Sequence, residues 1–435
     1  MAKDNYFLES GNQGLNRWGG VIDEEFLREL RGAKGIATYR EMADNDDMIG
    51  ASLYAIEMLI RQVKWDVEAG GTEDKDEECR EFVLSCMEDL DMPWTDFISE
   101  ALSFLTYGWS WHEIVYKRRS PNSKHGKSKF SDHLIGWKKL PLRSQSTLHH
   151  WEFDETNDDL LGMWQSAPPY YKQVFIPKEK SLHFRTKSQK GNPEGRSILR
   201  NAYRSWFFKK RLQELEGIGI ERDLAGLPVL ITPEGLDLFA PENAGQKAVA
   251  DRIVRTIKRD ENEGLVLPYG WDLKLLSSGG SRQNDTNQVI ERYDTKIAST
   301  MLTDFVQLGH EGVGSYALSS DKTALFSTAL GSFMDMICQV MNTQAIPKLI
   351  DLNKEAFHNI TDYPKLIHGD IETRNLEELG SFLKNAVGTG TITPDNALEE
   401  YLRREAGLPE RDEESTYEMN GTATSGYTYQ PPEEV

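Results

Sequence analysis

Apolar residues recur at helical spacing in the first part of the chain. Met48, Leu53, Ile56 and Ile60 lie three to five residues apart, which predicts an amphipathic helix. Pro93 and Gly108 are predicted stop signals for the helices that precede them. The helices predicted on these grounds span residues 44–65, 76–90 and 94–105. Residues 1–35 are polar, with scattered glycines, and are predicted to form an extended arm.

The pattern then changes from helical spacing to alternation. Trp109, Trp111 and Glu113 alternate with smaller or polar residues, which predicts a half-buried strand over residues 109–117. Residues 117–129 are basic and rich in turn formers, so they are predicted to form an exposed hairpin tip. Short strands rich in Trp, Tyr and Phe are predicted over residues 134–184, with the aromatic residues filling a core. Helices followed by short strands indicate an α+β domain.

Three long helices are predicted in the second half of the chain. They span residues 197–223, 285–308 and 322–344, the second with Asp285 as its N-cap and the third ending before Pro347. A compact unit separates the first two, with strands at 229–232, 265–267 and 271–276, a helix at 245–259 and a glycine-serine hinge at 277–281. A glycine-rich loop at 309–320 separates the last two.

The C-terminal part is predicted to be helical and then disordered. Two further helices fit residues 372–387 and 394–406, the latter with Thr393 as cap and Pro394 in its first turn. Residues 410–435 are acidic and rich in Gly, Ser and Thr, so they bury too little apolar surface to order on their own.

Composition and charge limit the possible partners. The 435 residues carry a formal net charge of −20, which makes tight, general DNA binding by phosphate neutralisation unfavourable but is compatible with DNA sliding past a wall. The chain has neither a signal peptide pattern at its start nor a run of eighteen apolar residues, so no membrane partner is expected. Cys79, Cys86 and Cys338 are predicted to be reduced thiols, because helical spacing puts the first two about 10 Å apart.

No motif in the sequence indicates a catalytic or metal site. Gly126-Lys127-Ser128 lacks the earlier glycine and the leading strand of a phosphate-binding loop, and the Gly191–Gly195 segment has no lysine. The adjacent pair His149 and His150 point to opposite faces of a strand, so they cannot share one metal ion. The sequence therefore predicts no catalytic residue, no metal and no cofactor.

Several stretches of the chain resemble tailed-bacteriophage portal proteins, in particular the Mu-like and related siphophage branch. Residues 191–229, GNPEGRSILRNAYRSWFFKKRLQELEGIGIERDLAGLPV, resemble the family most closely. Residues 44–70 (DNDDMIGASLYAIEMLIRQVKWDVEAG), residues 104–119 (FLTYGWSWHEIVYKRR) and residues 390–394 (GTITP) add to the match. No single motif is specific, but the order of these segments over residues 40–410 is.

The resemblance implies an α+β portal fold with a wing, a two-helix stem, a small α/β clip, a tunnel loop and a short helical crown. These parts would follow the N-terminal arm at 1–35 and precede the acidic disordered tail at 410–435. The implied bounds are 36–190 for the wing, 191–226 for the stem helix, 227–280 for the clip, 281–308 for the second stem helix, 309–322 for the tunnel loop, 323–365 for a long helix joining the wing and 366–409 for the crown.

The resemblance also implies a function. Portal proteins form rings, typically of twelve subunits, at one vertex of the capsid, where double-stranded DNA passes without sequence recognition during packaging and ejection. The implied partners are further copies of the chain, the terminase large subunit, the major capsid protein and scaffold, and a head–tail adaptor. The implied location is the portal vertex of the virion, and the host cytoplasm during assembly. The alternatives are another virion head–tail adaptor and a head-maturation enzyme.

Three clusters are candidate functional sites. The first cluster lies on the stem helix and is either a subunit interface or channel feature or a solvated helix face. The second lies on the clip helix and is either a terminase-docking or DNA-facing patch or an ordinary solvated face. The third lies in the tunnel loop and would contact DNA. Their members are, in this order, Lys209, Lys210 and Arg211; Arg252, Arg255, Lys258 and Arg259; and His310, Tyr316, Ser319 and Lys322.

Overall fold

The computed structural model describes residues 11–121, 126–155, 158–225, 227–256, 266–276, 286–303 and 316–371. Of residues 220–225, 227, 256, 275, 276 and 316–324 it describes the backbone alone. The predicted helices at 372–387 and 394–406, the acidic tail and the hinge at 277–281 lie outside these residues.

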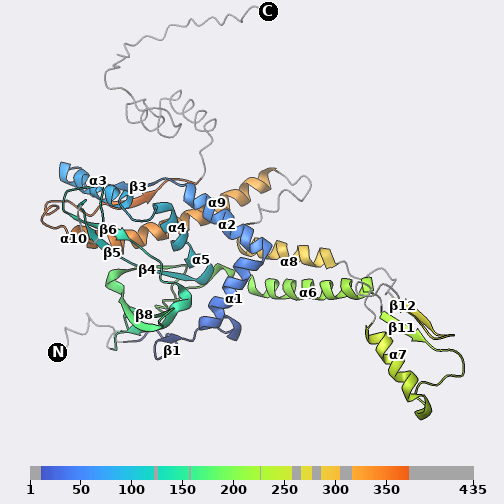
Figure 1. Cartoon of the computed structure of the whole chain (residues 1–435). Helices are drawn as coiled ribbons and strands as arrows, with labels where there is room; N and C mark the ends of the chain where they lie inside the picture. The colour runs from blue at the N-terminus through green and yellow to red at the C-terminus, as the bar shows by residue number, and fades with distance from the viewer. Residues whose placement is uncertain are drawn as a thin grey trace, which may run out of the picture. The chain divides into compact units, whose positions relative to one another are not determined.

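The chain contains both helices and short strands, with most of the strands between α5 and α6 (Figure 1). The α-helices are α1 (Gly32–Asn45), α2 (Asp47–Gln62), α3 (Asp74–Glu88), α4 (Trp94–Ala101), α5 (Ser103–Tyr107), α6 (Tyr203–Ala225), α7 (Ala244–Thr256), α8 (Thr286–Thr300), α9 (Tyr316–Val340) and α10 (Ile346–Asp351). The strands are β1 (Arg17–Trp18), β2 (Val21–Ile22), β3 (Trp65–Glu68), β4 (Trp109–Glu113), β5 (Val115–Arg118), β6 (Ile135–Lys139), β7 (Leu148–Phe153), β8 (Leu160–Ala167), β9 (Lys172–Pro177), β10 (Ser181–Arg185), β11 (Leu227–Ile231), β12 (Asp272–Leu276) and β13 (Lys365–His368).

The strands form small antiparallel sheets rather than one large sheet. Strands β7, β8 and β9 form a three-stranded sheet in sequential order, and the others form pairs. Strand β3 pairs with β13, and β4 pairs with β10, so each of these two sheets joins segments that are far apart in the sequence. The predicted mixture of helices and short strands is confirmed. Because β13 begins at Lys365, the segment predicted as residues 366–409 starts inside a strand that pairs with β3.

The arm at residues 1–35 was predicted to be extended, and in its described part, residues 11–35, this is wrong where the chain forms a hairpin and enters a helix. Residues 17–22 form the β1–β2 hairpin and α1 begins at Gly32. Tyr39 and Met42 of α1 are buried in a core that α6 and α8 complete. The sequence signal is weak because α1 has few apolar positions and no side-chain N-cap.

Strand β4 is buried on both faces, which the alternating pattern did not predict. Ser110 and His112 point away from the tryptophans, yet both side chains are fully buried. The hydroxyl of Ser110 donates to the carbonyl of Ala101 at 2.9 Å, and Nδ1 of His112 lies 2.8 Å from the carbonyl of Leu140. These hydrogen bonds compensate the burial of the Ser110 hydroxyl and of Nδ1 of His112, whereas Nε2 of His112 is buried without a hydrogen-bond partner among the described residues.

The basic hairpin predicted as an exposed tip at 117–129 is buried at its base, whereas Lys127 and Lys129 are exposed and residues 122–125 lie outside the described residues. Strands β5 and β6 do form a hairpin, but Lys117 and Arg119 at its base are buried. Lys117 forms ion pairs with Asp89 and Asp91 at 3.3 and 3.4 Å, and Arg119 with Asp132 at 3.1 Å. These two charges are compensated by carboxylates of the same chain.

The long helices were predicted correctly in order but not at every end. Figure 1 shows α6 and α8 side by side, and the two helices pack against each other. Helix α8 ends at Thr300, before the predicted residue 308, because Leu302 has a φ of +60°, which no α-helix allows. Helix α9 begins at Tyr316, so Tyr316, Ser319 and Lys322 belong to a helix and not to the predicted loop.

The third long helix does not stop before Pro347. A single π-helical stretch at Met341–Ala345 separates α9 from α10, and Pro347 lies in the first turn of α10. Proline is compatible with that position because no backbone N–H is needed there.

Strand β11, helix α7 and strand β12 make the compact unit between α6 and α8. Strands β11 and β12 are antiparallel, from Leu227 opposite Leu276 to Ile231 opposite Asp272. Helix α7 contacts β11. The predicted strand at 265–267 is absent from its described residues, 266 and 267.

The largest core lies between the helices and strands of the first 185 residues and α9–α10. Phe97, Phe104 and Trp137 are fully buried in it, together with Met334 and Leu349 from the later helices. The aromatic residues predicted to fill the core do so in the case of Trp137 and Trp151, whereas Tyr170 and Tyr171 are exposed. The three cysteines are free and buried, as predicted. No helix of the described segments is both long and apolar enough to cross a membrane.

Candidate functional site

Two glycines in close contact connect the start of α6 to the rest of the chain. Gly108, which ends α5, and Gly195 both have positive φ, at +92° and +57°. A Cβ on Gly195 would lie 2.2 Å from the carbonyl oxygen of Gly108. The hydroxyl of Ser197 donates to the carbonyl of Thr106 at 2.5 Å and accepts from the N–H of Leu199. The backbone before α6 is therefore fixed against α5.

A buried ion cluster then ties α6 to α2 and α8. Nζ of Lys209 lies 2.9 Å from a carboxylate oxygen of Asp46 and 2.5 Å from one of Asp294. Only 4% of the Lys209 side chain is exposed. Burial lowers the pKa of Lys209, but the hydrogen bonds that its ammonium group donates to Asp294 and Asp46, with the charges of these two carboxylates, outweigh burial, and the net shift is upward. Burial raises the pKa of Asp294 in spite of the lysine.

Asp46 has a second function in this cluster. It is the N-cap of α2, and one carboxylate oxygen accepts the backbone N–H groups of Met48 and Ile49 at 3.1 and 3.0 Å. A capping carboxylate at a helix N-terminus also interacts favourably with the helix dipole. The Asp46 side chain therefore caps the start of α2 and also holds α6 against it through Lys209.

The three basic residues predicted as one cluster on α6 are separated by the structure. Lys209 faces inward to Asp46 and Asp294, whereas Lys210 forms an exposed ion pair with Glu41 and Arg211 pairs with Glu214 at 3.0 Å. Lys209 is thus not on a surface that could contact DNA or a neighbour.

A hydrogen bond between hydroxyl groups holds the end of α8. Oγ of Ser52 in α2 and Oγ1 of Thr303 lie 2.7 Å apart, and both side chains are fully buried. The N–H of Thr303 donates to the carbonyl of Ala298, which closes the helix end. Leu302, with its positive φ, lies directly before this contact. The sequence reasoning missed Ser52 and Thr303, and no local pattern marks them.

The other predicted site residues are only partly described. Arg252 and Arg255 lie on the exposed side of α7. Lys258, Arg259 and His310 lie outside the described residues. Tyr316, Ser319 and Lys322 have a described backbone in α9 but no described side chains.

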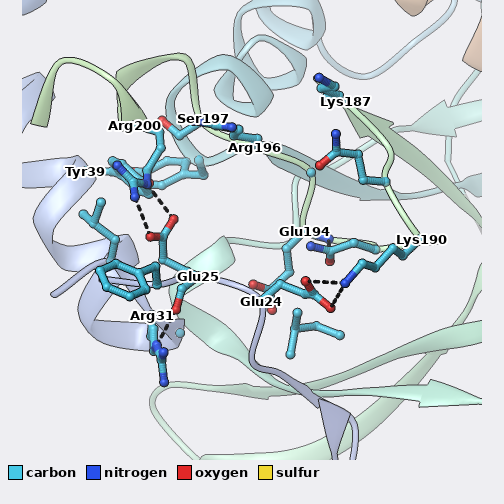
Figure 2. A pocket seen from close by; sticks show the side chains of 18 residues that line it. Glu24, Glu25, Arg31, Tyr39, Lys187, Lys190, Glu194, Arg196, Ser197 and Arg200 are labelled. Carbon is cyan, nitrogen blue, oxygen red and sulfur yellow. Dashed lines mark hydrogen bonds and ion pairs between the residues drawn. The ribbon is translucent and has the colours of Figure 1, made fainter. Parts of the chain in front are cut away.

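A polar pocket of about 300 Å³ lies beside the start of α6 (Figure 2). Figure 2 shows Arg200 directed at Glu25, with Nε and Nη2 donating to its two oxygens at 2.6 and 2.7 Å. Lys190 donates to Glu24 at 3.1 Å in the same view. These pairs fasten the N-terminal segment to the loop that precedes α6.

Glu194 lines this pocket without a cationic partner among the described residues. Its Oε1 accepts the indole N–H of Trp151 at 3.1 Å. Burial raises the pKa of Glu194 to about 6, and the Trp151 hydrogen bond opposes that shift. A carboxyl group in this environment keeps its proton to a higher pH than usual.

We expect replacement of Glu194 with glutamine to flatten the pH dependence of stability. In the wild type the folded state retains the proton between pH 4.5 and about 6 while the unfolded state has lost it. The free energy of unfolding therefore falls as pH rises through this window, by up to about 2 kcal/mol. Urea denaturation of both proteins from pH 4 to 7.5 measures this. If the free energy of unfolding changed with pH in the same way in the wild type and in Glu194→Gln, this prediction would be contradicted.

No group of three or more His, Cys, Asp or Glu side chains suited to holding a metal ion occurs in the described segments. The features assembled here are interfaces within the chain: a glycine contact, an ion cluster and a hydroxyl pair, all of which hold α6 and α8 in fixed positions.

Comparison with known proteins identifies the family. A chain from the virion of a native gene transfer agent particle is 12% identical, with a TM-score of 0.54 over 92% of this chain and 97% of that one. A chain from the neck of an empty gene transfer agent particle gives 0.51 at the same identity and coverage. These likenesses show a shared fold. Residues 36–408 match the family described as the portal protein of Mu bacteriophage. The chain belongs to the Mu bacteriophage portal protein family.

Proposed function

We propose that twelve copies of this chain form a ring at one vertex of a capsid. Double-stranded DNA passes through the ring during packaging and ejection without sequence recognition. The terminase large subunit docks on the ring during packaging, and a head–tail adaptor binds it later. The major capsid protein and scaffold surround it. The role is structural, with no reaction catalysed by the chain. The fold shared with chains from the virion and the neck of gene transfer agent particles supports this location.

The exposed apolar face of α6 carries the proposal. Phe207, Phe208, Leu215 and Ile218 are each 42–49% exposed. The last three, with Arg211, follow a spacing of three and four residues, which places them on one side of the helix. Lys209, on another side of α6, contacts Asp46 at the start of α2 and Asp294 of α8, and the ring of Phe208 also stacks on Tyr293 of α8 with 6.4 Å between the ring centroids. Apolar side chains gathered on one helix face mark an interaction surface.

A ring gives this face a partner. Subunits in a ring contact each other through two different surfaces, so each copy offers one face to its neighbour on each side. The α6 face then packs on the next copy, while the interior ion cluster keeps α6 and α8 in the same orientation in every copy.

The family membership supports a division of the chain into named parts. We assign α6 and α8 to the stem, residues 227–280 to the clip and residues 36–190 with 323–365 to the wing. The tunnel loop and crown proposed at residues 309–322 and 366–409 become shorter, because residues 316–322 belong to α9 and residues 366–368 to β13. Arg252 and Arg255, with Lys258 and Arg259, form the proposed terminase-docking patch of the clip. His310, Tyr316, Ser319 and Lys322 are proposed to line the passage.

The charge of the chain suits a conduit. At −20 per subunit, the ring repels DNA phosphates, so DNA is not retained at the wall. The basic residues of α6 do not reverse this, because Lys209 and Lys210 are both neutralised by carboxylates.

Replacement of Leu215 with glutamate is expected to reduce ring formation at least tenfold. Burying an unpaired carboxylate at a helix contact costs several kcal/mol, and about 1.4 kcal/mol is a factor of ten in association. Negative-stain micrographs with subunit counting, together with analytical ultracentrifugation, measure the fraction in rings.

The matched control is Tyr54→Glu, which places the same charge on an exposed position of α2. It is expected to form rings like the wild type. A wild-type chain that stays monomeric at high concentration would overturn the proposed function, and undiminished rings of Leu215→Glu would overturn the role of the α6 face.

A further inference from the structure

A second pocket lies near the one in Figure 2 and shares Lys190 with it. Its volume is about 240 Å³, and it is lined by five parts of the chain: the segment leading into β1, the β7–β8 connection, Lys178 between β9 and β10, the end of β10 with the following loop, and Gln344 of the π-helical stretch. This is below the range of about 300–1,000 Å³ that is usual for sites of drug-sized ligands. The space suits a single small group.

Arg185 is the central side chain of this pocket. It is the last residue of β10, and its Nη1 donates to Oγ of Ser188 at 3.1 Å and to the carbonyl of Asn192 at 3.0 Å. These two bonds orient the guanidinium group. No carboxylate of the described segments pairs with it. Burial lowers the pKa of Arg185, which is the mark of a positive charge that lacks a compensating anion.

Lys178 adds a second positive charge to the same space. Its ammonium group has no carboxylate within ion-pair distance among the residues described. Burial, together with the charges of Arg185 and Lys178, lowers the pKa of His183 to about 3, so both cations act on the same buried ring. His183 is therefore neutral, and its Nε2 lies 2.8 Å from the carbonyl of Pro193.

The remaining charges of the pocket are already paired. Arg17 forms an ion pair with Asp158, and Lys190 one with Glu24. The four cations that line the pocket are Arg17, Lys178, Arg185 and Lys190. They face three carboxylates: Asp158 and Asp159 of the lining, and Glu24 as the partner of Lys190. A local excess of positive charge stands out in a chain whose net charge is −20.

We propose that this pocket binds one oxyanion group, a phosphate or a carboxylate, between Arg185 and Lys178. A guanidinium group matches either oxyanion with two parallel hydrogen bonds, and a lysine adds a point charge. The anion supplies the charge that Arg185 lacks. Ser188 and Gln344 line the pocket as well, and the amide nitrogen of Gln344 remains free to donate because its oxygen accepts the N–H of His183 at 3.0 Å.

Titration of the purified full-length protein tests the proposal. Sodium phosphate is added in one arm and an acetyl-Gly-Glu-Gly-amide peptide in the other, with sodium chloride at equal ionic strength as the baseline. Isothermal calorimetry gives affinity, and thermal unfolding gives the stabilisation that binding to the folded state produces. Binding of phosphate alone assigns the site to a phosphate group, and binding of the peptide alone assigns it to an acidic side chain.

Arg185→Gln is expected to weaken binding tenfold or more, because it removes a charge-assisted hydrogen-bond donor. Lys178→Gln, at an exposed position that tolerates substitution, is expected to weaken it about three- to tenfold and covers the case in which Arg185→Gln fails to fold. The control Lys187→Gln removes an exposed cation of the same loop that does not line the pocket, and it should bind like the wild type.

Two results would overturn the proposal. One is the absence of binding in both arms. The other is equal affinity of the wild type and the Lys178→Gln variant together with an Arg185→Gln variant that is either equal to them or unfolded.

Discussion

We expect Lys209→Met to lower the free energy of unfolding by about 3–5 kcal/mol, because the substitution leaves two carboxylates without their shared cation. Asp46 and Asp294, which both contact Nζ of Lys209 in the wild type, would then lie close together without a cation, and their side chains are only 5% and 21% exposed. Methionine keeps the length of the side chain, so the loss reports the charge and not a cavity. Urea denaturation at neutral pH measures it.

Lys210→Met is the control one residue away. Its ion pair with Glu41 is exposed, and exposed pairs contribute about 0–1 kcal/mol. Similar losses for the two variants would mean that the Lys209 cluster is no stronger than a surface ion pair, and it would remove the argument that this cluster fixes α6 against α2 and α8.

The comparison of Lys209 with Lys210 shows where sequence reasoning fails. Both residues are charged and adjacent on one helix, and the sequence placed them with Arg211 on a single basic face. Burial depends on partners that lie far away in the chain, such as Asp46 and Asp294. Lys117 and Arg119 were misplaced for the same reason, because their carboxylate partners are supplied by other segments.

The elements themselves were easier to predict than their contacts. Helices α6, α7 and α8 follow from local periodicity and from glycine and proline signals, and their order was the basis of the family resemblance. Helix α1 was missed because its buried positions, Tyr39 and Met42, are too few to set a period. The end of α8 was misplaced because the apolar stripe continues past Leu302, where the backbone turns left-handed. The Ser52–Thr303 contact and the Arg185 pocket need three-dimensional packing, and no spacing in the sequence encodes them.

Gly195 offers the second large effect, because the start of α6 depends on backbone contact. Gly195→Ala is expected to lower the free energy of unfolding by about 2–5 kcal/mol. A left-handed backbone costs a residue with a Cβ about 1–2 kcal/mol, and overpacking adds about 1–3 kcal/mol. The new Cβ would lie 2.2 Å from the carbonyl oxygen of Gly108, and that oxygen also accepts the N–H of Thr186 at 3.0 Å. The oxygen cannot retreat without breaking that bond.

Gly217→Ala within α6 is the matched control, since it adds the same methyl group where nothing lies within 4 Å. It is expected to stabilise the protein by about 0.5–1 kcal/mol through helix propensity. Denaturation at one protein concentration compares the two variants in the same assembly state. A loss of stability for Gly195→Ala together with a gain for Gly217→Ala would show that the contact with Gly108 requires a glycine at position 195. If Gly195→Ala left the free energy of unfolding unchanged, the segments around Gly108 and Gly195 could move apart at no energetic cost. The start of α6 would then not be fixed against α5.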